Sequence, residues 1–315
     1  MNISIRQLEY VIAASRHRSI SRAAAEMSIS TSSIHAAIDR FETEFGLQVF
    51  VRRRSKGLSL TAAGERAIVR TIRLLADAEA FVQDLRSSDA RLSGVVRVGC
   101  FTSIAPNIAP QVIRALLAAH PDVTVHLVEG DIVTIQKFLR DGAVDLLLTY
   151  DAGLSDEFDH DVLATAPPHL VLAEGHRLAQ RSAIELRDLS SDPLLLLNLP
   201  QSRTYILSLF EQAGVQPGPI QRLESFEMVR GAAAAGLGVA ILNIRPPSDL
   251  TYSGMRVLCR PLVAAARSPS IVIATRKGGR ISRRAEAFWQ CCRDFFATED
   301  ARQLFLHPAG SDQHA

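Results

Sequence analysis

The fold of the first part of the chain is decided by residues 30–64, which read STSSIHAAIDRFETEFGLQVFVRRRSKGLSLTAAG. Ser30 is suited to cap the start of a helix, and Gly46 is suited to end it. Between them the apolar residues recur every three or four positions, at Ile34, Ala37, Ile38, Phe41 and Phe45. This spacing predicts a helix with one buried face and a short polar face opposite.

Two more helices are predicted upstream. The first covers about residues 4–15, and the second is short and capped by Ser19 or Ser21. A turn at residues 28–30 separates the second helix from the third. A helix, a tight turn and a helix with small polar side chains form a helix-turn-helix, which can approach base edges in the major groove of DNA. On spacing alone, an ordinary helical hairpin fits equally well.

A basic hairpin is predicted after the third helix. Residues 47–51 are typical of a strand, residues 52–57 form a basic loop that ends in glycine, and residues 58–60 are typical of a second strand. Four cations on such a wing suit contacts with DNA phosphates, although solvated surface charges are the alternative. Residues 1–60 carry nine basic and five acidic side chains, so their net charge is +4 and the remaining residues carry −2. A basic segment on a slightly acidic chain favours a polyanionic partner.

Four motifs resemble the LysR-type transcriptional regulators: residues 6–8, residues 21–24, residues 30–42, and Phe50-Val51-Arg52 leading to residues 60–64. The resemblance implies a winged helix-turn-helix over residues 1–60. The family usually has Gln in place of Thr31 and often Ser in place of His35, which leaves the base readout open. We expect contacts with double-stranded DNA from Ser30, Thr31, Ser32, Ser33, His35, Ala36, Arg40, Arg52, Arg53, Arg54 and Lys56.

A long helix is predicted from Thr61 to about Ser87, within a linker segment of residues 61–92. The residues of one face recur by steps of three and four, at Ile68, Thr71, Leu75, Ala78, Val82 and Leu85, and all of them are apolar except Thr71. This is the spacing of a coiled-coil seam, with a core helix of one globular domain as the alternative. The resemblance implies that this helix pairs two subunits, that the pair reads an interrupted palindrome, and that two dimers form a tetramer.

The rest of the chain alternates between strands and helices, which predicts an α/β domain with parallel sheets. This pattern is similar to the two lobes of periplasmic solute-binding proteins. By the family's pattern, an effector-binding domain covers residues 93–297, followed by a tail of residues 298–315 that we expect to be partly disordered. Lobe one then takes residues 93–161 and 268–297, and lobe two takes residues 162–267.

Ligands of such sheets bind beyond the carboxyl ends of strands, where helices begin. Hydroxyl groups and free N–H groups there can hold a carboxylate, and Arg203 could clamp one. Simple helix caps are the alternative for the serine and threonine residues. We therefore expect a small polar effector, with a carboxylate, bound by Thr102, Ser103, Thr149, Tyr150, Ser202, Arg203, Phe226 and Glu227.

Other classes of protein fit the sequence poorly. Four cysteines lack the spacing of disulfide frameworks or zinc sites, and the nine histidines are scattered. Gly236-Leu237-Gly238 precedes a strand instead of a helix, so it is no dinucleotide fingerprint. We expect no enzyme activity, cofactor or metal, no membrane span, and, because the N-terminus lacks an apolar signal core, a cytoplasmic location. A solute receptor without DNA function and a metabolic enzyme are the alternatives.

Overall fold

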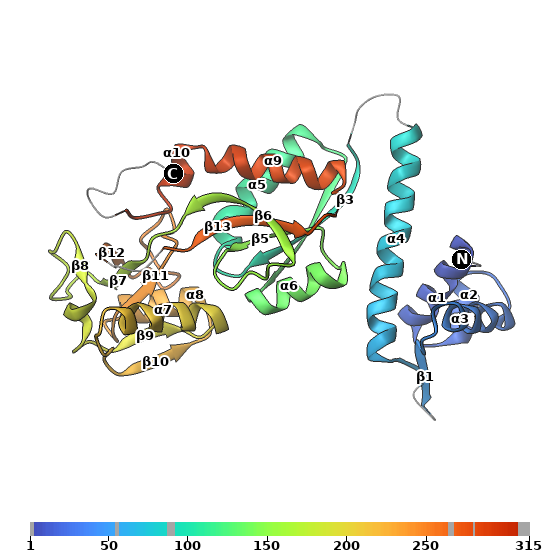
Figure 1. Cartoon of the computed structure of the whole chain (residues 1–315), viewed down its shortest axis with the longest axis horizontal. Coiled ribbons are helices and arrows are strands. Elements are labelled where there is room, and N and C mark those ends of the chain that lie inside the picture. The colour runs from blue at the N-terminus through green and yellow to red at the C-terminus, as the bar shows by residue number, and fades with distance from the viewer. Residues whose placement is uncertain (1–2, 54–56, 87–91, 264–267, 280, 308–315) are drawn as a thin grey trace. The chain divides into compact units, whose positions relative to one another are not determined.

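The computed structural model of the protein describes residues 3–53, 57–86, 92–263, 268–279 and 281–307. The chain forms two compact units, one of Met1–Val95 with Arg140–Ala143 and the other of Val96–Leu139 with Val144–Ala315. We call them the head and the body (Figure 1). No helix among the described residues is both long and apolar enough to cross a membrane.

The head begins with the three predicted helices, α1 (Ile5–His17), α2 (Ile20–Glu26) and α3 (Thr31–Phe45). Serine side chains at positions 4, 19 and 30 cap them. Each serine hydroxyl accepts a hydrogen bond from the backbone N–H of the residue three positions later. Gly46 ends α3 with a φ of 61°, a left-handed conformation that favours glycine. The apolar faces meet in one core, which includes Leu8, Val11, Ile34 and Phe41.

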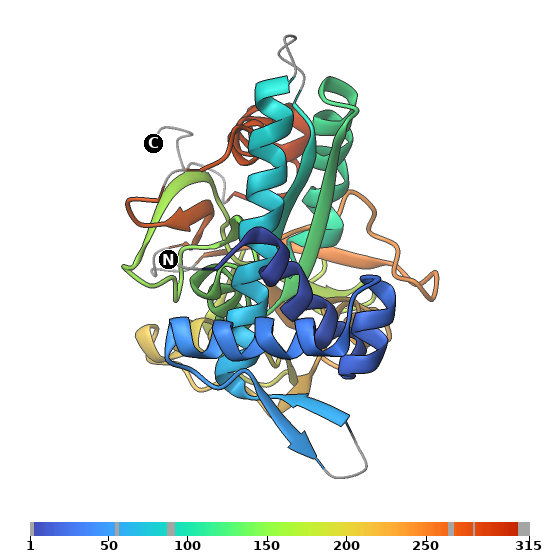
Figure 2. The ribbon, with the colours of Figure 1, turned by 90° about the vertical axis from the view of Figure 1, so that its right-hand side faces the viewer.

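The predicted wing is present but displaced along the chain. Its antiparallel strands are β1 (Phe50–Arg53) and β2 (Gly57–Leu60), shown extending from the helices in Figure 2. The first strand was expected from Leu47, but the segment before Phe50 is held by α3 instead. The Glu42 carboxylate accepts the Val49 N–H at 2.6 Å and the Phe50 N–H at 3.1 Å. Arg54 and Lys56 lie outside the described residues.

The long helix, α4 (Ala62–Arg86), starts as predicted, because the Thr61 hydroxyl accepts the Gly64 N–H at 2.8 Å. Its apolar stripe is divided between two environments. Ile68 is buried in the head core, and Leu75 packs against that core. We expected Leu75 to lie in a seam between two subunits, but it has contacts within its own subunit. Val82, two turns further on, is 42% exposed. The side chain of Leu85 is not among those described.

Lobe one of the body contains a five-stranded sheet in the order β4-β3-β5-β13-β6. Helices α5 and α9 lie on one face of this sheet, and α6 lies on the other (Figure 1). Strands β3 and β5 are parallel as predicted, but β13 runs antiparallel to both of its neighbours, so the expectation of a wholly parallel sheet is wrong. The bounds are β3 Gly94–Phe101, α5 Ala105–Ala119, β4 Val123–Gly130, α6 Ile132–Asp141, β5 Leu146–Tyr150, β6 Phe158–Thr165, β13 Ser270–Arg276 and α9 Arg283–Phe296.

Lobe two has a four-stranded sheet in the order β11-β7-β12-β8, and the parallel pair β9 and β10. A parallel bridge from Leu194 to Val239 links β9 to the segment leading into β11. Strand β7 runs antiparallel to both β11 and β12. The bounds are β7 His169–Ala173, β8 Ile184–Glu185, η1 (a 3-10 helix) Leu186–Leu189, β9 Leu194–Leu197, α7 Pro200–Gln212, β10 Ile220–Leu223, α8 Phe226–Ala234, β11 Ala240–Leu242 and β12 Val257–Val263.

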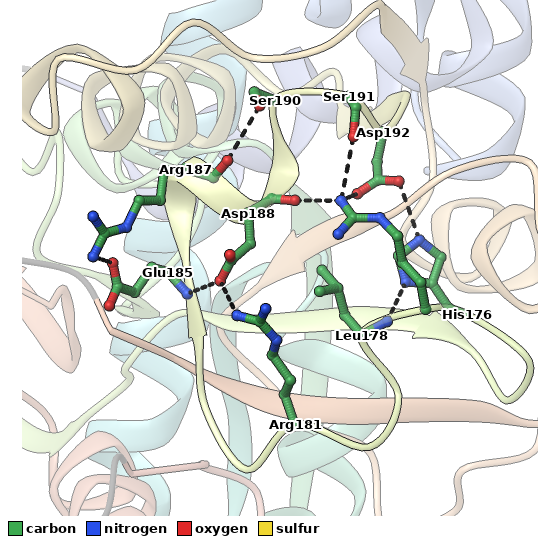
Figure 3. Close-up of polar contacts among 10 residues, drawn as sticks. His176, Leu178, Arg181, Glu185, Arg187, Asp188, Ser190, Ser191 and Asp192 are labelled. Atoms are coloured by element: carbon green, nitrogen blue, oxygen red, sulfur yellow. Dashed lines mark hydrogen bonds and ion pairs between the residues drawn. The ribbon is translucent and has the colours of Figure 1, made fainter.

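Polar contacts fix the irregular segment between β7 and β9 (Figure 3). Arg177 donates to the Asp192 carboxylate at 2.6 Å, and Arg181 donates to the Asp188 carboxylate at 3.0 Å. His176 accepts the Leu178 N–H at 3.3 Å through Nδ1. These contacts hold the segment against η1 and complete the outer edge of lobe two.

The chain passes between the lobes at residues 166–168 and again between Val263 and Ser270. Because β6 belongs to the lobe-one sheet, the first passage follows Thr165 instead of residue 161 as expected. The start of the tail, residues 298–307, is ordered. Helix α10 (Glu299–Arg302) follows α9, Leu304 is 1% exposed, and its carbonyl accepts the Arg245 N–H of lobe two at 2.8 Å.

Candidate functional site

The polar face of α3 is the candidate DNA interface in the head. Thr31, Ser32, Ala36 and Arg40 are exposed on it, and His35 is half-buried. The Ser30 hydroxyl caps the helix and lies 2.8 Å from the Ser32 hydroxyl. Arg40 forms no ion pair with any other described residue. The first turn of α3 therefore combines hydroxyl groups, small side chains and the positive end of a helix dipole.

The wing is fixed beside these helices by its backbone. The Leu58 N–H of β2 donates to the Arg18 carbonyl, between α1 and α2, at 2.9 Å. Arg52 and Arg53 lie in β1, opposite Leu58 and Gly57. Their side chains, like Arg54 and Lys56, are outside the described part, so contact with phosphate remains a prediction for all four.

The body contains a cavity between its lobes, which we call the interlobe cavity. Its volume is about 50 Å³. Lobe one supplies walls from the ends of β3 and β5 and the start of α6, and lobe two supplies walls from α7, α8 and β11. Its aromatic and polar lining consists of Phe101, Ser103, Tyr150, Gln201, Ser202, Tyr205, Phe226 and Asn243.

Four of the eight predicted effector residues line this cavity: Ser103, Tyr150, Ser202 and Phe226. The two from lobe one face the two from lobe two, as expected of ends of strands and starts of helices around a cleft. Burial raises the pKa of Tyr150 far above its usual value, against an opposing hydrogen bond from Ser103. Tyr150 also packs edge-on against Phe101, with ring centroids 5.5 Å apart.

The other four predicted residues are turned elsewhere. The Thr102 N–H donates to the Gly130 carbonyl at 3.1 Å, and the Thr149 hydroxyl is buried without a hydrogen-bond partner among the described residues. Arg203 donates to the Asn198 side chain at 3.2 Å. None of these three, nor Glu227, lines the cavity.

Glu227 is held in a partly buried ion pair. Its carboxylate contacts Arg230 at 2.6 Å and accepts the Tyr252 N–H at 2.7 Å. Arg230 is buried and donates further to the Ser248 and Leu250 carbonyls at 2.8 and 3.2 Å. The pair therefore joins the segment after β11 to α8, so Glu227 is turned away from the effector contact that we expected.

The two helix starts differ from each other. Helix α5 begins at Ala105, two residues after Ser103, and the Thr102 N–H is already occupied, so the expected free donors at Thr102 are absent. Helix α7 begins at Pro200, earlier than the expected Ser202, and Leu199 at its N-cap offers no side-chain cap. The first backbone bond of this turn is from the Arg203 N–H to the Leu199 carbonyl at 2.9 Å. The N–H groups of Gln201 and Ser202 thus have no partner within α7, and both residues line the cavity.

Sequence reasoning missed three polar residues of the lining. Gln201 belongs to the first turn of α7, and Tyr205 lies three residues after Ser202 on the same helix. Asn243 directly follows β11, so the rule that selected Thr149 and Tyr150 could have found it. Burial raises the pKa of Tyr205 to about 12, while a hydrogen bond with the Asn243 side chain acts in the opposite direction.

Thiol and metal chemistry find little support in the described residues. No cysteine lines the interlobe cavity, and burial raises the pKa of the Cys100 thiol far above its usual range. The described part of the chain holds no cluster of three or more histidine, cysteine or acidic side chains that could bind a metal ion.

Comparison with known proteins matches both parts of the chain. Residues 5–65 match the family described as bacterial regulatory helix-turn-helix protein, lysR family. Residues 89–297 match the family described as LysR substrate binding domain. Together the two matches cover the helix-turn-helix and wing of the head and most of the body, and leave residues 66–88 of the linker between them.

Similar proteins of comparable length are regulators by name. The chain is 25% identical over 295 residues to the HTH-type transcriptional regulator YfeR of Shigella flexneri, covering 93% of this chain and 94% of that one. It is 24% identical over 293 residues to the DNA-binding transcriptional dual regulator OxyR of Escherichia coli, covering 92% and 95%. The crystal structure of HinK, a LysR family regulator from Pseudomonas aeruginosa, is 31% identical, with a TM-score of 0.60 over 94% of this chain and 99% of that one.

Proposed function

Since the chain belongs to the LysR family of bacterial transcriptional regulators, we propose that it binds an interrupted palindrome of double-stranded DNA as a dimer, and that a small molecule in the interlobe cavity changes this activity. One observation carries the proposal: a single chain joins an exposed, capped recognition helix to a two-lobed body with an internal cavity. A DNA-binding regulator of this kind acts in the cytoplasm, which we include in the proposal. Catalysis is no part of it.

DNA recognition is divided between α3 and the wing. Cations on the wing neutralise phosphates and so give affinity without sequence preference, whereas Thr31 and His35 on α3 face base edges. Replacing Arg52, Arg53 and Arg54 together with Ala should weaken binding to every DNA sequence. The slope of log affinity against log salt should also flatten by about one unit for each lost contact. Unchanged affinity and slope would remove the wing from the interface.

The recognition helix gives a matched comparison. Thr31→Gln and His35→Ser should change which base pairs are preferred while leaving the salt slope as it was, because neither residue carries the phosphate contacts. Competition between DNA sites that differ at single base pairs measures this preference. If both variants keep the wild-type preference at every position, base readout does not involve this face of α3.

The second half of α4 is the surface we assign to dimer formation. Val82 exposes an apolar side chain there, in the heptad register of Ile68, and such a helix is stabilised by a partner. Val82→Asp should break the dimer in sedimentation experiments, and Val82→Leu should preserve it. This pair of variants is cleaner than a change at Leu75, which packs against the head core. A dimer that survives Val82→Asp would refute the assignment. The tetramer, formed by two such dimers, is part of the proposal.

The effector is proposed to place a carboxylate at the start of α7. The Gln201 and Ser202 N–H groups, the Ser202 hydroxyl and the positive end of the helix dipole all favour an anion there. Ser202→Ala should therefore weaken the effector response while DNA binding stays near wild type. Thr204→Ala, on the exposed side of the same turn, is the matched control. Thermal unfolding of the full chain against a metabolite library identifies the effector, because a ligand of the folded state raises the melting temperature.

A further inference from the structure

We infer that Asn243 latches the hinge between the two lobes, because it ties the first passage between them to the wall of the interlobe cavity. Its side chain lines the cavity and donates a hydrogen bond from Nδ2 to the Ala166 carbonyl at 2.8 Å. Asn243 is thus a positioning residue that connects the state of the cavity to the arrangement of the lobes. This role rests on the proposed function of the cavity, and it holds for any class of occupant.

The first passage, residues 166–168, is buried and stiff. Pro167 and Pro168 follow Ala166, and each proline ring fixes one backbone φ angle. The Ala166 N–H donates to the Pro269 carbonyl of the second passage at 2.8 Å, so the two passages are tied to each other. A displacement of the Ala166 carbonyl therefore moves the whole passage, because no soft turn absorbs it.

The second passage is fastened to lobe one where it ends. Asp151 directly follows β5, and its N–H donates to the Ser270 carbonyl at 2.9 Å. The Asp151 Oδ1 accepts the Ser270 N–H at 2.8 Å. The first passage is fastened to lobe two by Asn243, which directly follows β11. The hinge thus has an anchor in each lobe, and the anchor in lobe two also lines the cavity.

The same amide reaches helix α7. A hydrogen bond joins the Asn243 side chain to the Tyr205 side chain, which also lines the cavity. An amide has two N–H donors and an acceptor oxygen, so Asn243 can hold the Ala166 carbonyl and the Tyr205 hydroxyl together. An occupant that contacts Tyr205 or Asn243 therefore acts on the group that sets the hinge. It shifts the lobes to the extent that it binds one arrangement better than the other.

The lobes are in contact beside the cavity, so the structure is that of a closed arrangement. Gly153, in the turn after β5, has a φ of 81°, and a methyl group placed on it would lie 2.7 Å from the Gln201 side chain of lobe two. The Gln136 amide fixes this turn, donating to the Gly153 carbonyl at 2.8 Å and accepting the Ser155 N–H at 3.0 Å. The latch stabilises this arrangement from the side of the hinge.

Amide hydrogen exchange of the full-length protein, with no small molecule added, tests the latch. Asn243→Leu keeps the size of the side chain and removes its hydrogen bonds, so the Ala166 amide should exchange about tenfold faster. The Ser270 amide is bonded to Asp151, in the other passage. It should also exchange faster, by roughly threefold or more, because both passages move when the lobes open. The Leu148 amide of the buried strand β5 should keep its rate, which shows that the variant is folded.

The matched control is Asn198→Leu. Asn198 is also a half-buried asparagine directly after a strand of lobe two, but its side chain contacts Glu224 and Arg203. This variant should leave the Ala166 and Ser270 amides at wild-type rates. Equal acceleration by Asn198→Leu would show a general loosening of lobe two and would overturn the latch.

Tyr205→Phe is a milder variant that removes one hydroxyl group, and it decides the question if Asn243→Leu does not fold. It should accelerate the same two amides in the same direction by a smaller factor, because Asn243 loses one of its partners. Faster exchange at Ala166 alone, with Ser270 at its wild-type rate in each folded variant, would reduce Asn243 to a local contact. That result would refute its role as a latch.

The outcome is separable from that of the proposed function, because hydrogen exchange needs neither DNA nor an effector. If the two hinge amides respond as described while Asn243→Leu keeps wild-type DNA binding and effector response, the latch stands and the proposed coupling of cavity to DNA is wrong. If the hinge amides do not respond, the latch is wrong whatever the variant does to DNA binding.

Discussion

His169 makes the stability of the body sensitive to acid. It is the first residue of β7, its side chain is fully buried, and neither ring nitrogen has a hydrogen-bond partner among the described residues. Burial, with the charges of Arg245 and Arg230 nearby, lowers its pKa from 6.5 to about 3. Between pH 6.5 and about pH 3 the histidine is therefore neutral in the folded body, whereas it becomes protonated in the unfolded chain.

The magnitude follows from the difference between the two pKa values. Above pH 6.5 both states are neutral and the group has no effect. As the pH falls below 6.5 the unfolded chain binds a proton that the folded body does not, so stability is lost down to about pH 3. At 1.36 kcal/mol per pH unit, the loss is about 2 kcal/mol at pH 5 and about 5 kcal/mol below pH 3.

The assay compares wild type with His169→Phe, which cannot be protonated. Trp289, the single tryptophan, lies on α9 in the body and reports urea unfolding by its fluorescence. Between pH 7.5 and pH 5 the wild type should lose about 2 kcal/mol more than the variant. Val171→Ala, a buried change on the same strand, should lower stability equally at both pH values. The reasoning fails if wild type and His169→Phe show the same dependence on pH.

Three further predictions concern stability. Arg230→Met should lower the free energy of unfolding of the body by about 1–3 kcal/mol in urea titrations, because it removes the donor to Glu227 and leaves the Ser248 and Leu250 carbonyls without this partner. Leu304→Ala should cost about 2–5 kcal/mol by the same Trp289 signal, since Leu304 is fully packed where the tail meets lobe two. Ser30→Ala should cost about 1 kcal/mol of head stability, measured by circular dichroism of unfolding, because it removes the cap of α3. Changes below a few tenths of a kcal/mol would contradict the assigned contacts.

The helices were predictable because their signals are local. Ser30 and Gly46 bound α3 by capping, and Thr61 starts α4 through one hydroxyl group. Strands β6 and β12 were missed because their sequences conflict with strand propensity. Asp159 and Asp161 interrupt β6, which lies at a sheet edge, and Pro261 lies within β12. The direction of β13 could not be predicted from the sequence either. A pattern of alternating strands and helices favours parallel pairing, but β13 follows the strands of lobe two and pairs antiparallel with β5 and β6 of lobe one.

For the candidate effector site, the sequence predicts which strand ends and helix starts meet, but not where their side chains point. Ends of strands and starts of helices do converge on the cavity, which is why Ser202 and Phe226 line it. The direction of a long charged side chain depends on partners distant in sequence. Glu227 is turned by Arg230, which in turn is fixed by carbonyl groups near residue 250, and no local pattern indicates that contact. The cavity lining is uncharged because Glu227 and Arg203 have partners elsewhere.

The central claim is that the chain reads DNA as a symmetric dimer. Selection of binding sites from random-sequence DNA by the full-length protein, followed by sequencing, tests it most directly. Two heads related by two-fold symmetry should enrich two inverted copies of one half-site, separated by a spacer of fixed length. Enrichment of a single unrepeated motif, or no enrichment over the starting DNA, would contradict the account.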